Sequence, residues 1–210
     1  MKKNKTAIPE KFLHQVLKPA RYTGGEFGNI YKDEQNIPVK FALAFPDIYD
    51  VGMSYLGFKI LYHLLNQQEY IWAERVYTPW VDMQKIMQAE QLTLGSIESK
   101  RALNEFDFVG FTLQYEMSYT NIVKMLQLGK IDLLAKERDE NQPFIVGGGP
   151  CVYNCEPLAD FFDIFIIGEG EEVLIELCAA YRNWKLAGRV GGKKEFLRLA
   201  AQISGIYIPN

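Results

Sequence analysis

The chain has 210 residues, 48% of them hydrophobic and 23% charged, and its formal net charge is −3. This length and composition fit one globular domain, with or without an additional arm. The slight acidity argues against a nucleic-acid-binding module, which presents a clustered basic face. No apolar run reaches the ~18 residues that span a membrane, and the first residues lack the apolar core of a signal peptide.

Three cysteines, Cys151, Cys155 and Cys178, are too few for a disulfide framework in a chain of this length. Cys178 falls on an apolar helical face, where a core residue is expected. We therefore predict a cytoplasmic protein that binds neither nucleic acid nor a membrane.

The first 38 residues do not follow a regular hydrophobic period. They contain one short helical pattern that ends at Pro19, followed by a turn-rich stretch around Gly24, Gly25 and Gly28. We predict that residues 1–38 form an arm that packs on the domain.

From Val39 onward, continuous apolar runs alternate with segments of helical period. Strands are expected at Val39–Phe45, Ile71–Tyr77, 106–113, 144–146 and 164–167. Helices are expected at 54–65, Val81–Ala89 and 196–203, and also after Ser118 and after Glu172. Such strands, separated by helices, predict an α/β fold with a doubly wound parallel sheet, either Rossmann-like or flavodoxin-like.

The helix at 54–65 carries its leucine and isoleucine side chains on one face, and Ser54 is a suitable N-cap. The residues expected to form this buried face are Leu56, Ile60, Leu61, Leu64 and Leu65. The two later helices are expected to bury Tyr119, Ile122, Val123 and Leu126, and Val173, Leu174, Leu177, Cys178 and Tyr181.

Residues 39–184 form the predicted α/β domain. Residues 185–210 hold a C-terminal helix and a β-like run at 206–209. A strand at the extreme end of the chain indicates that a longer protein continues into a further domain.

Right-handed crossovers bring the carboxyl ends of parallel strands to one edge, where such sheets bind ligands. Four loops meet at that edge: 46–54, 114–118, a glycine loop at 147–150 and an acidic loop at 168–172. Glycine at a strand-to-helix turn permits close approach of the backbone to a ligand. Each glycine equally suits a tight turn, but three in succession favour a ligand site.

Neither glycine-containing loop spells a nucleotide fingerprint. Val152 and Val173 stand where the third glycine of the dinucleotide motif falls, and there is no P-loop, so an NAD or ATP site is disfavoured. Glu169, Glu171 and Glu172 cluster at a helix start, where they either complement the helix dipole or accept hydrogen bonds from a ligand. No nucleophile, base and orienting group assemble, so we predict no catalytic residue.

Residues 45–54 (FPDIYDVGMS), 111–121 (FTLQYEMSYTN), 147–150 (GGGP) and 168–172 (GEGEE) together resemble the N-terminal region of B12-binding-domain radical SAM proteins. The resemblance extends from residues 18–22 to 206–209 and covers most of the chain. It implies a cobalamin-binding-type Rossmann domain, followed in the full-length protein by a radical SAM barrel with a 4Fe-4S cluster and S-adenosylmethionine. That barrel is the implied partner of this chain, alongside a small-molecule ligand.

The cluster-binding motif of such a barrel, Cys-x3-Cys-x2-Cys, is not found in this chain. Cys151 and Cys155 have the first spacing, but Leu158 occupies the third position. Because a cluster normally takes four thiolates, we predict no metal ligands here. The catalytic half of the implied enzyme would lie outside this chain.

Cobalamin domains that ligate cobalt carry Asp-x-His-x-x-Gly after the first strand. This chain has Asp47-x-Tyr49-x-x-Gly52, and a neutral phenol is a poor transition-metal ligand. The resemblance thus implies a cobalamin-type pocket that lacks its metal ligand. The cofactor-binding residues that it implies are Asp47, Tyr49, Gly52, Ser54, Thr112, Gln114, Gly147, Gly148, Gly149, Pro150, Gly168, Glu169 and Gly170.

Three hypotheses for function follow. The first is a cobalamin-binding-like domain that presents a cofactor or substrate to a radical SAM barrel. The second is a scaffold that binds no small molecule, with its pocket filled by side chains such as Tyr49, Met53 or Tyr115. The third is a flavodoxin-like nucleotide or flavin binder, which would be yellow on purification.

Overall fold

A computed structural model describes residues 8–34 and 37–209 of the chain. Its strands form one sheet, ordered β2-β1-β3-β4-β5-β6, in which the first five are parallel and β6 runs antiparallel to β5. The strands are β1 (Val39–Phe45), β2 (Ile71–Tyr77), β3 (Phe108–Thr112), β4 (Phe144–Gly148), β5 (Ile164–Ile166) and β6 (Ile206–Tyr207). The predicted doubly wound α/β fold is confirmed, with the flavodoxin-like strand order.

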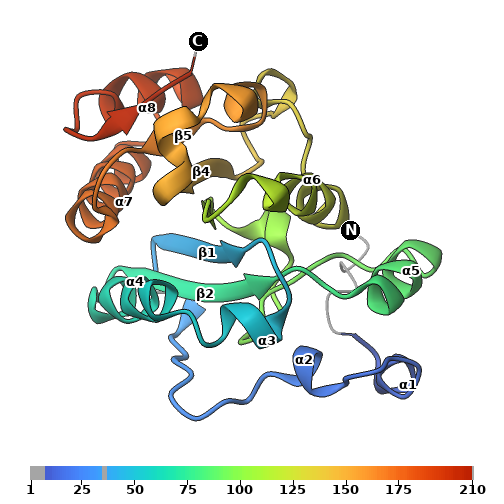
Figure 1. Cartoon of the computed structure of the whole chain (residues 1–210). Helices are drawn as coiled ribbons and strands as arrows, with labels where there is room; N and C mark the ends of the chain where they lie inside the picture. Colours follow the sequence, from blue (N-terminus) through green and yellow to red (C-terminus); the bar gives the residue numbers. More distant parts are fainter. Residues whose placement is uncertain (1–7, 35–36, 210) are drawn as a thin grey trace.

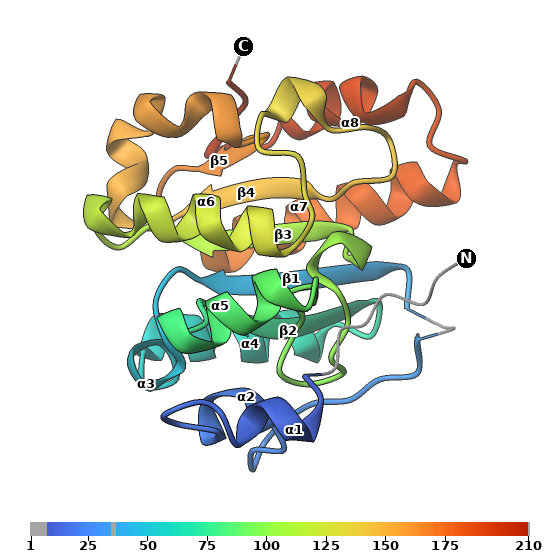
Figure 2. The same cartoon turned by 90° about the vertical axis from the view of Figure 1, so that its right-hand side faces the viewer.

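Helices cover both faces of this sheet. One face carries α4 (Leu56–Gln67), α7 (Gly170–Leu186) and α8 (Gly192–Ala200), and the other carries α5 (Val81–Ala89) and α6 (Tyr119–Leu128) (Figures 1 and 2). A separate hydrophobic cluster fills the space on each face. Burial on both faces explains why the strands are almost continuously apolar. None of these helices is long and apolar enough to cross a membrane, as far as the described residues show.

The edge strand β2 is the exception to this apolar rule, because Glu74 and Arg75 lie buried within it. Glu98 covers Arg75, accepting hydrogen bonds from its backbone N–H (2.8 Å) and its Nε (2.7 Å). The backbone N–H of Ile97 also donates to the carbonyl of Arg75 at 2.9 Å. The segment around residue 97 therefore blocks an edge that would otherwise be free to pair with another chain.

The residues before β1 pack on the domain beside this edge. They contain α1 (Glu10–Leu13) and α2 (Ala20–Thr23), and Phe12 and Val16 join the same hydrophobic cluster as α5. Farther along the arm, Glu26 pairs with Arg75 at 2.9 Å, and the Asn29 side chain accepts a hydrogen bond from Arg75 at 2.7 Å. Residues 1–7 and 35–36 of the predicted arm lie outside the described residues, as does residue 210 of the C-terminal segment.

The buried face predicted for the helix at 54–65 is wrong in part. Helix α4 buries Phe58, Tyr62 and Leu65, whereas Leu56 is 68% exposed and Ile60 is 39% exposed. The prediction weighed only aliphatic side chains, but the aromatic face buries more area. Phe58 packs against the Phe45 ring, which turns the helix away from the predicted orientation.

Helix α8 and strand β6 complete the same layered unit. Phe196 is fully buried, with its ring 4.8 Å from that of Phe144 and 5.3 Å from that of Tyr181. Strand β6 pairs with β5 through Ile206 and Ile166. The predicted boundary after residue 184 falls inside α7, which also buries four of the residues expected of it: Leu174, Leu177, Cys178 and Tyr181.

Candidate functional site

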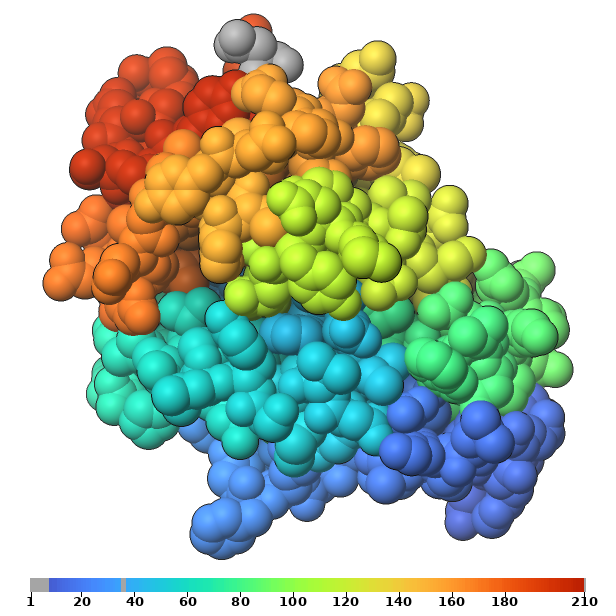
Figure 3. Space-filling view, viewed as in Figure 1, coloured from blue at the N-terminus to red at the C-terminus, as the bar shows by residue number. Residues whose placement is uncertain are grey.

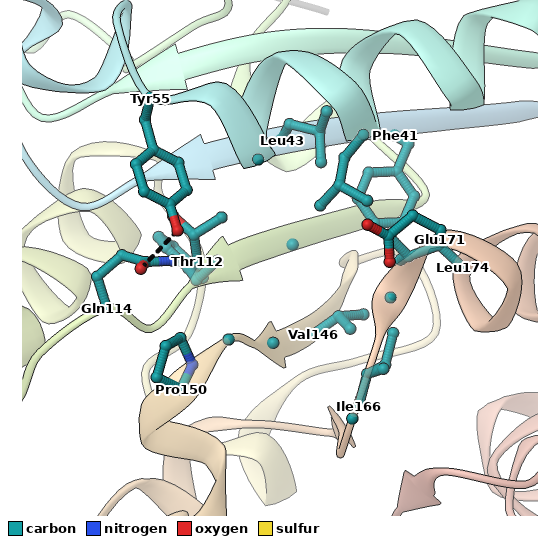
Figure 4. A pocket seen from close by; sticks show the side chains of 18 residues that line it. Phe41, Leu43, Tyr55, Thr112, Gln114, Val146, Pro150, Ile166, Glu171 and Leu174 are labelled. Atoms are coloured by element: carbon teal, nitrogen blue, oxygen red, sulfur yellow. Dashed lines mark hydrogen bonds between the residues drawn. The ribbon is translucent and has the colours of Figure 1, made fainter.

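A pocket of about 170 Å³ lies at the carboxyl edge of the sheet, on the face that carries α4 and α7. The segments that follow β1, β3 and β4 are far apart in sequence and meet around this edge in the space-filling view (Figure 3). The pocket is lined by Phe41, Leu43, Tyr55, Gly57, Leu61, Gly110, Phe111, Thr112, Gln114, Val146, Gly148, Gly149, Pro150, Ile166, Gly168, Gly170, Glu171 and Leu174 (Figure 4).

Glycine on the sheet surface creates the hollow. Side chains alternate between the two faces of a strand, so Val146 and Gly148 of β4 share the face that is turned toward α4 and α7. Gly148 pairs with Thr112 on one side and with Ile166 on the other. A Cβ atom built at Gly148 meets nothing within 4 Å, so the missing side chain leaves open space.

The three consecutive glycines serve three different purposes. A Cβ at Gly147 would lie 2.8 Å from the Phe165 ring, so this glycine permits tight packing on the opposite face of the sheet. Gly148 opens the pocket, as described above. Gly149 has φ of +111°, a conformation that other residues rarely adopt, and it turns the chain toward Pro150. The strand-to-helix turn and the ligand space are therefore separate properties of neighbouring residues.

Polar groups stand at the two ends of this largely apolar pocket. Thr112 is 8% exposed, and its Oγ1 has no hydrogen-bond partner. Beside it, the Tyr55 hydroxyl donates a 2.8 Å hydrogen bond to Oε1 of Gln114. At the other end, Glu171 enters from the first turn of α7 (Figure 4). A buried hydroxyl without a partner costs free energy, so a ligand that bonds to Thr112 would recover it.

The pocket lining contains one acidic side chain and no basic side chain. No lysine, arginine or histidine is among the residues that line it, and Glu171 contributes a carboxylate. Glu172 adds a second acidic side chain in the same helical turn. These groups complement the dipole at the start of α7, and the walls suit a neutral ligand better than a phosphate.

The loop after β1 contributes Tyr49 to a different part of the molecule. Tyr49 lies in the short helix α3 (Tyr49–Gly52), and its ring meets that of Tyr77 edge-on at 5.3 Å. Burial and a hydrogen bond to Glu26 of the arm raise the pKa of Tyr49 to about 12. The phenol is therefore neutral at physiological pH and directed toward the arm.

The other predicted residues of that loop also form local contacts. The Asp47 side chain accepts a hydrogen bond from the backbone N–H of Ile48 (2.7 Å) and one from the Tyr115 hydroxyl (3.2 Å), and this neighbour raises the pKa of Tyr115. A Cβ at Gly52 would lie 2.6 Å from the Tyr77 ring, so Gly52 is a packing residue. Ser54 donates to the carbonyl of Val51 at 3.0 Å, and the N-cap position of α4 is Tyr55. The prediction of Ser54 as N-cap was wrong.

The structure thus divides the predicted binding residues into two groups. Those that line the pocket are Thr112, Gln114, Gly148, Gly149, Pro150, Gly168 and Gly170. Those outside its lining are Asp47, Tyr49, Gly52, Ser54, Gly147 and Glu169. Sequence reasoning did not place Tyr55, Leu61 or Leu174 in the site, and it left open whether Glu171 contacts a ligand or complements the helix dipole. The alternation of side chains along β1 and β4 could have placed Leu43 and Val146 in the site. The helical residues depend on how each helix is oriented on the sheet, which the sequence did not give.

Cys151 and Cys155 are free thiols that follow the glycine loop. Cys151 is partly buried and Cys155 is buried, and burial raises the pKa of both. Raised pKa values disfavour the thiolate that metal binding requires. Within residues 8–34 and 37–209, no three histidine, cysteine or acidic side chains gather closely enough to hold a metal ion.

The scaffold hypothesis predicted that the pocket would be filled by Tyr49, Met53 or Tyr115. None of these three lines it, and the space remains open. The flavodoxin-like hypothesis gains support from the strand order, but a flavin mononucleotide needs a phosphate site, and the lining offers no cation.

One comparison with known proteins identifies a family. A family model described as the N-terminal region of radical SAM proteins matches residues 57–209. An uncharacterized protein of the archaeon Methanocaldococcus jannaschii is 37% identical over 86 residues, which are 39% of this chain. The match spans 17% of that archaeal protein, so the chain corresponds to a small part of it. No solved structure matches the chain.

Proposed function

This chain belongs to the family of N-terminal regions of radical SAM proteins, and from that premise we propose that it is an accessory domain which holds a cobalamin-type ligand in its carboxyl-edge pocket. In this proposal the domain presents the ligand to a radical SAM barrel, which carries the 4Fe-4S cluster and S-adenosylmethionine. The observation that carries the proposal is the open pocket itself, with the unpartnered Thr112 hydroxyl and the bare surface of Gly148.

The pocket has room for one aromatic ring of the base of a cobalamin nucleotide tail. An engineered protein cavity of roughly 150 Å³ binds benzene, and this pocket measures about 170 Å³. A planar ring system would lie between the sheet surface at Gly148 and Leu61 of α4, and Thr112 would donate a hydrogen bond to a ring nitrogen. Bound cobalamin would bring a redox-active cobalt centre to the edge of the sheet.

The domain does not fit the role of an axial cobalt ligand. Tyr49 stands at the position of the usual histidine, but its ring packs on Tyr77 and its pKa is raised by burial and by the carboxylate of Glu26. A neutral phenol held in this way leaves the cobalt face without a protein ligand. The proposal is therefore tail binding without axial ligation.

The surface around the pocket supports docking of a partner domain. Large apolar side chains are exposed on the segments after β1, β3 and β4, namely Leu56, Met117 and Tyr153. Met117 is 85% exposed, although monomeric surfaces seldom gather such residues around one opening. The barrel of the full-length protein is the proposed partner of this surface.

Spectroscopy tests the proposal directly. We expect the purified chain, incubated with hydroxocobalamin and desalted, to retain the visible spectrum of the cofactor. Gly148→Leu places its Cβ in open space and should abolish retention, because the side chain takes the space of the base. Ala187→Leu, an equivalent enlargement at the exposed far end of α7, is the matched control and should retain it.

Absence of retention by the unmodified chain at high micromolar cofactor would overturn the cobalamin proposal. Equal retention by Gly148→Leu and the unmodified chain would show that the cofactor binds elsewhere. A yellow colour of the freshly purified protein would instead favour the flavin hypothesis.

A further inference from the structure

We propose that the carboxyl-edge pocket selects an uncharged nucleoside moiety, with its heteroaromatic base beside Thr112 and its ribose hydroxyls on Glu171. This inference rests on the proposed function and specifies the chemistry that the pocket recognises. It assigns Glu171 as a specificity-determining residue, a role that neither the family description nor the cobalamin proposal gives it.

The Thr112 end of the pocket suits the base. Thr112 is more than nine-tenths buried, and its unpartnered hydroxyl faces walls formed by Leu43, Val146 and Ile166. A flat, neutral ring gains from such apolar walls and from one hydrogen bond to an acceptor nitrogen. The Tyr55 ring, held by its hydrogen bond to Gln114, closes this end of the pocket.

The Glu171 end suits the sugar. It is the more open end, because Gly168 and Glu169 beside it are exposed. A carboxylate has acceptor oxygens only, so its natural partners here are hydroxyl donors. Dinucleotide-binding folds use an acidic residue in the same way to bind a ribose hydroxyl. Figure 4 shows Glu171 directed toward the space between the sheet and α4, opposite Thr112.

A terminal phosphate on the sugar is disfavoured. The lining has no basic side chain, and Glu171 places a carboxylate at this end. The dianionic phosphate of a free nucleotide would lie near a like charge without a cation to offset it. A phosphodiester, which carries one charge and continues into solvent, meets a smaller penalty.

Two kinds of ligand contain such a nucleoside moiety. One is the nucleotide tail of cobalamin, whose base, ribose and diester have these properties. The other is a free nucleoside. The probes are therefore benzimidazole, benzimidazole riboside and the 5′-phosphate of that riboside, each titrated calorimetrically into the full chain and then tested for competition with hydroxocobalamin.

We expect the riboside to bind about tenfold more tightly than the base, and its 5′-phosphate to bind about tenfold more weakly than the riboside. Glu171→Gln should remove most of both differences while leaving the affinity for the base unchanged. Glu172→Gln, at the exposed neighbouring position, is the matched control and should preserve both. Thr112→Val should weaken the base and the riboside alike, since both bond to the same hydroxyl.

The outcomes separate the two proposals. Cobalamin retention with no preference for the riboside over the base would overturn this inference and leave the proposed function standing. Riboside binding that depends on Glu171, without cobalamin retention, would support this inference and overturn the cobalamin proposal. An equal effect of Glu171→Gln and Glu172→Gln would overturn the assignment of Glu171, and no binding of any probe together with no retention of hydroxocobalamin would overturn both proposals.

Discussion

The loops after β1 and β4 lie at the same edge of the sheet, yet they use their residues in opposite ways. In the β1 loop, Tyr49 packs on Tyr77 within the influence of the Glu26 carboxylate of the arm, and Gly52 permits close packing against that same ring. In the β4 loop, Gly148 faces open space and pairs across the sheet with the unpartnered Thr112. Both loops begin where a parallel strand ends, and only one leaves room for a ligand.

This difference shows that position at the carboxyl edge is necessary for a site in such a sheet but does not make one. A binding loop must also leave space and polar groups that the fold does not consume. The β1 loop serves stability and attachment of the arm, and the β4 loop serves the ligand. Substitutions at matched positions of the two loops test whether the first affects stability and the second affects the ligand.

The largest expected effect on stability is that of Gly52→Val. Its side chain would meet the rings of Tyr77 and Phe45 at less than 3 Å, and overpacking of this kind costs about 3 kcal/mol. At Gly148 the Cβ of the same residue meets no atom within 4 Å, so we expect a loss below about 1 kcal/mol. Urea unfolding of the two variants measures the difference, and equal losses would contradict the division between the loops.

A smaller effect is expected of Tyr49→Phe. The variant keeps the ring contact with Tyr77 and loses the interaction of the hydroxyl with the Glu26 carboxylate, which should lower the free energy of unfolding by at most about 1 kcal/mol. Hydroxocobalamin retention should not change, because Tyr49 lies outside the pocket lining. Loss of retention in this variant would place Tyr49 in the ligand site after all.

Thr112→Val should leave stability unchanged or raise it by up to about 1 kcal/mol, because it replaces an unpartnered buried hydroxyl with a methyl group of similar size. Ligand affinity should fall at the same time. Thermal unfolding and cofactor titration of the same preparation test whether stability is kept while ligand affinity falls. A clear loss of stability would mean that the Thr112 hydroxyl is bonded within the protein and is not free to bond to a ligand.

The smallest effect concerns pH and the arm. Arg21 and then Lys18 lower the pKa of Asp50 from 3.8 to about 2 in the folded protein. The unfolded carboxyl binds protons more readily, so this contribution is present above pH ~4 and is lost as pH falls toward about 2. The protection factors for hydrogen exchange at residues 18–24, which correct for the intrinsic pH dependence of exchange, should therefore fall as the pH drops through that window.

Asp50→Asn is expected to remove this response near Arg21. The arm has a second acid-sensitive attachment at Glu34, whose pKa is lowered to about 2 by Arg101 and Lys40. Exchange near Glu34 should keep its pH dependence in the variant and serves as the internal control. An unchanged response at residues 18–24 in Asp50→Asn would assign it to another group.

Much of the fold could be predicted from the sequence, because strands buried on both faces consist of continuous apolar runs such as Phe41 to Phe45. The orientation of α4 could not, since its aliphatic and aromatic residues compete for the core and Phe58 prevails through its contact with Phe45. The helical residues that line the pocket, such as Leu61, were missed for the same reason.

The site shows a similar limit. Gly148 and Thr112 follow from glycine placement and strand alternation, both of which are local properties. Tyr49 matches the position of a cobalt ligand in the motif, but its direction depends on Glu26 of the arm, which is distant in sequence. No pattern along the chain records such a contact.

The most direct test of the central claim is the electron paramagnetic resonance spectrum of reduced cobalamin bound to the chain. If the nucleotide base leaves cobalt and enters the pocket, and if Tyr49 provides no ligand, the cobalt signal should lack the nitrogen triplet that an axial nitrogen ligand produces. Gly148→Leu should abolish this bound signal. A nitrogen triplet in the spectrum of the bound cofactor would contradict the account, because a nitrogen would then remain on cobalt.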